Sequence, residues 1–186
     1  MSERALGQTA KQAVLFLRQF HRDVQALIHS LDEALGKAHW NTAMGGRVSS
    51  DLSNGLNAER WVLNSVTRIY VPKAQAECKI LAVSIELAPN AMDESVLLCA
   101  SVRYSVFVDP RQDVWPRWAS SDAVIAYLAA NPGPQDLGRG LLDDGFMPGA
   151  ASARGFIVPL CTLTSADALH DKVVKPALSM AGNAES

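Results

Sequence analysis

The chain has 186 residues, of which 48% are hydrophobic and 19% are charged, the balance of a globular protein with enough residues to form a core. The net charge is −2 with both signs scattered along the chain, which argues against a general nucleic-acid or membrane-surface binder. The first residues lack a signal-peptide core, and no apolar run reaches the roughly 20 residues that span a bilayer, so we expect a cytoplasmic protein with no membrane contact.

The stretch 8–35 has an uninterrupted helical pattern that contains neither proline nor glycine. Its apolar residues recur at steps of three and four, which places them on one face of a helix. They are Phe16, Leu17, Phe20, Val24, Leu27, Ile28, Leu31, Ala34 and Leu35. Gly36 follows, and glycine is common where a helix ends in the left-handed conformation. The pattern indicates either a helix that covers its own β-sheet or one that also binds a partner as a coiled-coil seam would.

The region after this helix divides into a segment without helical periodicity and a segment that has it. Residues 38–57 are dense in Gly, Ser and Asn, so we predict a long connection, anchored by Trp40, Met44 and Val48. Residues 57–72 keep helical spacing and end at Pro72, which favours a second helix. The consecutive apolar residues at 69–71 leave a strand open as the alternative.

Three later segments are predicted strands because they are rich in β-branched residues. Residues 79–87 and 95–108 should pair as an antiparallel hairpin. Residues 155–163 form the third, and Pro159 within it indicates an edge position or a bulge, since proline cannot donate a ladder hydrogen bond.

Two further helices are predicted in the second half of the chain. Residues 121–131 form a short helix, and residues 166–181 form the last one, with Thr164 or Ser165 as its N-terminal cap. Pro176 should kink this helix or end its first half.

These elements predict an α+β fold, in which a small, mainly antiparallel sheet of three or more strands is covered by the long N-terminal helix and a C-terminal helix. We expect a single domain over residues 1–186, in which the amphipathic helix at 8–35 can also mediate assembly.

The three cysteines, Cys78, Cys99 and Cys161, are far apart and form no CxxC pair. The spacing therefore indicates neither a structural zinc site nor a redox pair, and we expect three reduced, buried thiols. We expect no metal ion and no cofactor.

Two pairs of residues have the spacing of a nuclease site. Arg22 and His29 lie about two helical turns apart on one face, where a histidine could transfer a proton and an arginine could bind phosphate. Glu77 and Lys79 are one residue apart at the start of a strand, as in metal-dependent nuclease cores. Both spacings also occur by chance between solvated charges.

Two other segments contain residue types that catalytic or nucleotide-binding sites use. Cys161 and His170, with Asp167 and Asp171 beside the histidine, could form a thiolate–imidazole pair, although an inert buried thiol is the simpler interpretation. The glycine-rich segment 137–149 matches no nucleotide-binding motif and is interpreted as a surface loop.

The aromatic cluster at 115–118 is the second candidate contact surface, because tryptophan and arginine dominate interface hot spots. The alternative is that its rings anchor a loop to the core.

The sequence therefore favours a non-catalytic interaction protein, an oligomerising or adaptor subunit that binds itself or another protein through the N-terminal helix. The alternatives are a metal-dependent nuclease using Glu77 and Lys79, and a small-molecule-binding domain. The predicted binding residues are Phe20, Val24, Leu27, Leu31, Trp115, Arg117 and Trp118.

Overall fold

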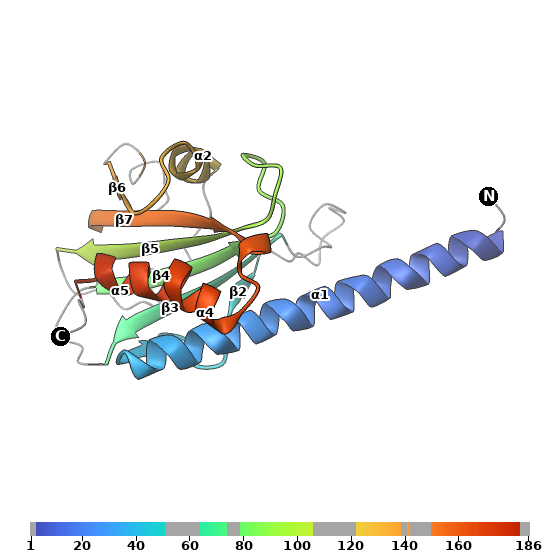
Figure 1. Cartoon of the computed structure of the whole chain (residues 1–186), viewed down its shortest axis with the longest axis horizontal. Helices are drawn as coiled ribbons and strands as arrows, with labels where there is room; N and C mark the ends of the chain where they lie inside the picture. Colours follow the sequence, from blue (N-terminus) through green and yellow to red (C-terminus); the bar gives the residue numbers. More distant parts are fainter. Residues whose placement is uncertain are drawn as a thin grey trace.

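A computed structural model describes residues 3–50, 64–73, 79–105, 122–138, 141 and 150–182. Over these residues the chain has an α+β fold, as predicted, with helices against both faces of one antiparallel sheet (Figure 1).

Within the described residues the sheet has seven strands, and every pair of neighbours is antiparallel. The order is β1-β3-β4-β5-β7-β6, and β2 also pairs with β3. The strands are β1 (Trp40–Thr42), β2 (Ser49–Ser50), β3 (Ser65–Pro72), β4 (Lys79–Glu86), β5 (Val96–Tyr104), β6 (Gln135–Leu137) and β7 (Ala150–Pro159).

The predicted hairpin of β4 and β5 is confirmed, and it forms the centre of the sheet. All residues of β4 are buried, and β5 exposes Arg103 alone. Burial on both faces explains why their sequences are nearly continuous apolar runs instead of alternating ones. The face of β5 that includes Ser101 is therefore covered except at Arg103.

Six helical segments accompany the sheet within the described residues. They are α1 (Glu3–Lys37), α2 (Asp122–Ala130), the 3-10 turn η5 (Leu160–Thr162), α4 (Ala166–Leu169), the π-helical η6 (His170–Val174) and α5 (Lys175–Met180). The second half of α1 and the α4–α5 segment cover one face of the sheet, and α2 covers the other (Figure 1).

Two hydrophobic clusters correspond to these two faces. The larger joins Leu31 and Leu35 of α1, alternate residues of the central strands such as Leu81 and Leu97, and Leu178 of α5. The smaller packs α2, with Val124 and Leu128, against the other face. The first half of α1 contributes no residue to either cluster up to Leu17, and it extends away from the sheet (Figure 1).

The helix predicted over residues 57–72 is wrong where the structure describes it, because residues 65–72 form β3. The apparent helical spacing arises because β3 is buried on both faces over Val66–Tyr70, so its apolar residues do not alternate with polar ones. Within 38–57, described up to residue 50, the chain forms β1 and β2 instead of a plain connection. Trp40 is buried as predicted and Met44 is half-buried, but Val48 is exposed and does not anchor the segment.

Two helix ends also differ from the prediction. Gly36 remains inside α1, and His39 takes the left-handed conformation, with a φ of 64°. The last helix is capped by Ser165, which accepts a hydrogen bond from the Ala168 amide at 3.1 Å. It widens into the π-helical η6 just before Pro176, a local adjustment to a residue that cannot donate a backbone hydrogen bond.

Pro159 is the last residue of β7 and pairs with Val96 of β5. The other neighbour, β6, reaches only Ala153–Gly155, so Pro159 has an edge position locally, as its missing donor requires.

Candidate functional site

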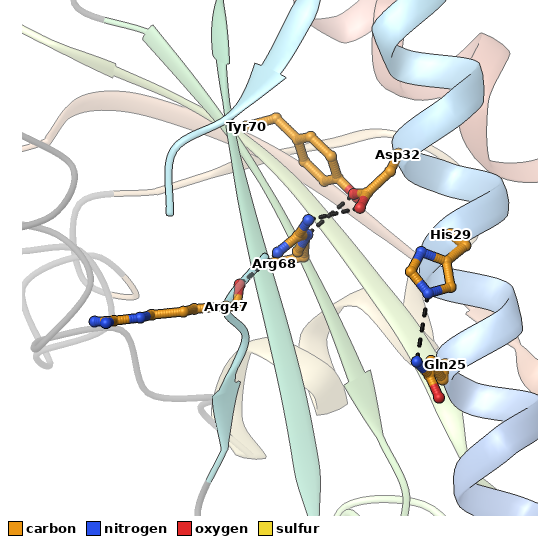
Figure 2. A network of polar contacts seen from close by, with 6 residues as sticks. All are labelled: Gln25, His29, Asp32, Arg47, Arg68 and Tyr70. Atoms are coloured by element: carbon orange, nitrogen blue, oxygen red, sulfur yellow. Dashed lines mark hydrogen bonds and ion pairs between the residues drawn. The ribbon is translucent and has the colours of Figure 1, made fainter. Parts of the chain in front are cut away.

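A buried polar clamp fixes α1 to the sheet (Figure 2). Arg68 of β3 donates from Nε and Nη2 to the two oxygens of Asp32 of α1, at 3.0 and 2.6 Å. Tyr70, two residues along on the same face of β3, donates its hydroxyl to Asp32 Oδ1 at 2.9 Å. Arg68 also donates from Nη1 to the backbone carbonyl of Arg47. One carboxylate of α1 thus holds two side chains of the sheet, which sets the rotation of the helix on the sheet.

Electrostatics keep the clamp in its bonded form. The Arg68 side chain is 7% exposed and that of Asp32 is 22% exposed. Burial lowers the pKa of Arg68, but the hydrogen bonds and charge of Asp32 outweigh burial and raise it overall. Burial and the nearby charge of Asp32 raise the pKa of Tyr70, so its hydroxyl stays protonated and continues to donate.

A second polar cluster lies on the other face of the sheet. Thr67 and Ser84, which face one another across β3 and β4, are joined by a hydrogen bond of 2.7 Å between their hydroxyls. Ser84 also contacts Glu86 Oε1, at 2.5 Å. All three side chains are buried, so this cluster serves cross-strand pairing and offers no open face for a substrate.

The first half of α1 has the opposite character. Every residue from 7 to 16 is exposed, and we call this segment the arm. It includes Val14, Leu15 and Phe16, which are 49%, 52% and 68% exposed. Large apolar side chains exposed together on one segment are typical of a contact surface.

The apolar stripe of α1 passes without a break from the docked half of the helix, residues 24–37, into the arm. Two series at intervals of seven residues form it, and such spacing keeps one face of a helix. The first is Ala10, Leu17, Val24 and Leu31, and the second is Ala13, Phe20, Leu27 and Ala34. Burial rises along the stripe, from exposed alanines through half-buried Leu17 and Phe20 to buried Val24 and Leu31.

The polar side of the arm and of the turns that follow it is basic. Residues 7–22 contain Lys11, Arg18 and Arg22 and no Asp or Glu. All three cations are exposed, and their spacing of seven and four places them together, away from the apolar stripe. Leu15 also lies opposite the stripe, so it is the exposed leucine of α1 that a contact through the stripe would not use.

The predicted binding residues fall into three groups. Val24 and Leu31 are buried in the core beneath α1, and Phe20 and Leu27 are half-buried at its margin. Trp115, Arg117 and Trp118 lie outside the described residues. Sequence periodicity could not separate the docked half from the arm, because both halves have the same stripe.

Two residues of the nuclease-like spacings, His29 and Lys79, contact other parts of the fold. Arg22 and His29 are exposed on α1, and the His29 ring lies 3.4 Å from Gln25 (Figure 2). Lys79 is buried and donates to the Ala181 carbonyl at the end of α5, a helix-capping contact. Glu77 lies outside the described residues.

The cysteine prediction needs one correction. Cys99 is buried as expected, and burial raises the pKa of its thiol to about 12. Cys161 is exposed, because it lies in η5 after β7 has ended and not within the strand, and its Sγ lies 3.6 Å from Glu94 Oε2. His170 instead contacts Asp171, with Nδ1 3.5 Å from Oδ1. Cys78 lies outside the described residues.

Comparison with protein-family models, with curated proteins and with solved structures gave no match for this chain. Among the residues that the structure describes, no three histidines, cysteines or carboxylates are grouped as metal ligands would be. None of the described helices has the length and apolar character needed to cross a bilayer.

Proposed function

We propose that this protein is an interaction subunit that uses the arm of α1 as its contact surface and the sheet domain as a rigid base. The observation that carries the proposal is the uncovered part of the stripe. The large side chains Val14 and Phe16, which flank the stripe on the arm, are exposed, whereas Val24 and Leu31 of the stripe are buried further along α1.

The clamp supports this proposal because it gives the arm a fixed direction. A helix held only by apolar contacts can rotate or slide, whereas a carboxylate bonded to Arg68 and Tyr70 has one position. A pre-oriented arm loses less conformational freedom when it binds.

The stacked rings of Phe16 and Phe20 add a second supporting feature. Their centroids are 6.2 Å apart and their planes differ by 14°. Phe20 packs against the core and Phe16 does not, so the pair continues the apolar surface of the domain into the arm. Aromatic side chains of this kind provide large contact areas at interfaces.

Site-specific photocrosslinking tests the proposal in cells that produce the protein. A benzoylphenylalanine placed at Leu17 lies on the stripe, and the same group at Leu15 lies on the opposite side of the helix. We expect covalent protein adducts from position 17 and few from position 15. Equal adduct formation at the two positions, or none at either, would contradict a contact through the stripe.

A further inference from the structure

We infer that the partner of the arm is the arm of a second copy of this chain, bound in antiparallel orientation. This inference rests on the proposed function and names the occupant of its contact surface. It is argued from the direction of the stripe, the sizes of its residues and the charges around it.

The direction of the stripe argues against a partner with a flat contact surface and against a partner helix that runs parallel to α1. Because the stripe follows one face of α1, on the arm it faces the side on which the sheet domain packs against the docked half. Figure 1 shows the domain on one side of α1 only. A flat surface brought against the stripe would meet the domain first. A parallel partner helix would place two domains in the same space. An antiparallel helix places its own domain at the N-terminal end of α1, so the two domains lie at opposite ends of the paired segment and do not collide with each other.

The residue sizes match in the antiparallel register. In an antiparallel helix pair, a core position near the start of one paired segment faces a core position near the end of the other. Ala10 therefore lies opposite Phe20 of the second copy, and Ala13 lies opposite its Leu17. Each large side chain therefore meets a small one, which lets the helices pack closely. A parallel pair would put Phe20 against Phe20 and Ala10 against Ala10.

The same register covers the exposed apolar residues nearest the stripe. Val14 and Phe16 flank the middle of the pairing, so each lies beside its own counterpart in the second copy. These are two of the large hydrophobic residues that α1 exposes, and the third, Leu15, stays on the outer side. A two-fold symmetric contact would thus cover Val14 and Phe16 and leave Leu15 exposed.

The charges also agree with this arrangement. Lys11, Arg18 and Arg22 lie away from the stripe, so antiparallel pairing brings no like charges into the seam. Residues 7–22 carry a charge of +3. The whole chain carries −2 and residues 1–6 carry one charge of each sign, so residues 23–186 carry −2 − 3 = −5. The basic segment 7–22 of one copy therefore approaches a domain of opposite charge in the other.

The size of the contact predicts a reversible dimer. Ten to fifteen residues of one helix per copy bury less than the about 800 Å² per partner of a standard interface. We expect dissociation at micromolar concentration, about 1–100 μM. Sedimentation velocity of the full chain over this range should show conversion of a 20.0 kDa monomer to a dimer.

Paired cysteines test the register directly, in a chain with Cys78→Ser and Cys161→Ser and with Cys99 buried. We expect a disulfide-linked dimer when Ala10→Cys and Phe20→Cys chains are mixed and oxidised, and none from either variant alone. Crosslinking of each variant to itself would show a parallel pair and overturn the inference.

Phe16→Arg and Leu15→Arg form the matched control for association. The first should abolish the dimer and the second should leave it intact, with unchanged circular dichroism in both. A wild-type chain that stays monomeric at every concentration would overturn the inference. Photocrosslinks from position 17 to a different protein would then still support the proposed function, so the two failures are distinguishable.

Discussion

The two halves of α1 have the same pattern of apolar residues and opposite environments. In the docked half, Leu31 is 1% exposed and packs against the sheet, whereas Phe16 in the arm is 68% exposed. At 1.5 Å per residue the 35-residue helix is about 50 Å long. The sheet domain covers only part of that length. Periodicity in the sequence thus identifies the apolar face of a helix. The size of the domain decides how much of that face is buried within one chain.

A series of identical leucine truncations should show the largest difference between the halves. Leu31→Ala leaves a cavity in the core and should lower the free energy of unfolding by about 3 kcal/mol. Leu15→Ala removes an exposed side chain and should change it by less than about 0.5 kcal/mol. Leu17→Ala should fall between them. Urea unfolding of dilute protein measures all three, and equal losses at Leu15 and Leu31 would show that the arm is part of the folded core.

Breaking the clamp should have the next largest effect. Arg68→Met leaves Asp32 without its cation and should lower the free energy of unfolding by about 2–3 kcal/mol. The loss should be smaller than for a fully buried ion pair because the Asp32 side chain is 22% exposed. The double variant Arg68→Met, Asp32→Leu should be less destabilised than the sum of the single variants, because the two side chains are coupled.

The exposed pair of Glu33 and Lys37, at 2.8 Å, is the control for the clamp. Its removal by Lys37→Met should give no measurable change in urea unfolding, since both side chains are solvated. Additive effects of Arg68→Met and Asp32→Leu would contradict the assigned role of the clamp.

Alkaline pH should weaken the domain by a smaller amount. The pKa of Cys99 is raised by burial from 9.0 to about 12, so between these values the unfolded chain loses a proton that the folded chain keeps. Stability is therefore fully present below pH 9 and falls as the pH rises, by about 1 kcal/mol at pH 10. Cys99→Val should lose less stability between pH 8 and 10 than the wild type. An identical loss in both would show that Cys99 is not responsible.

Substitution of Phe16 should have the smallest effect on folding. Phe16→Ala should change the free energy of unfolding of the monomer by less than about 0.5 kcal/mol. The same change should raise the dissociation constant of the dimer at least tenfold, because aromatic residues at the middle of an interface contribute most. Urea unfolding at low concentration and sedimentation at high concentration separate the two effects. If Phe16→Ala lowered the free energy of unfolding and left the dissociation constant unchanged, Phe16 would belong to the folded core and not to the contact surface.

The elements with strong local patterns were predictable from the sequence. The spacing over residues 8–35 predicted α1, and β-branched content predicted the hairpin of β4 and β5. The sequence predicts Thr164 or Ser165 as the cap of the last helix, since both hydroxyls precede it directly, and the structure has Ser165 in that position.

The errors arose where long-range contacts decide the structure. Residues 65–72 form a strand because β1, β2 and β4 pair with them, and in a strand buried on both faces such pairing leaves only a weak local signal, here the apolar residues 69–71. The Asp32–Arg68 pair joins positions 36 residues apart, so spacing could not reveal it. An aspartate beside a buried stripe and an arginine inside an apolar strand were its only signals.

Hydrogen exchange along α1, measured at low and at high protein concentration, tests the central claim most directly. We predict slow exchange over residues 24–35 at both concentrations, and exchange over residues 8–16 that is fast at 1 μM and slowed at several hundred micromolar. Slow exchange of residues 8–16 in the dilute protein would show that the arm is covered by its own chain. Fast exchange at the highest concentration would contradict pairing between arms.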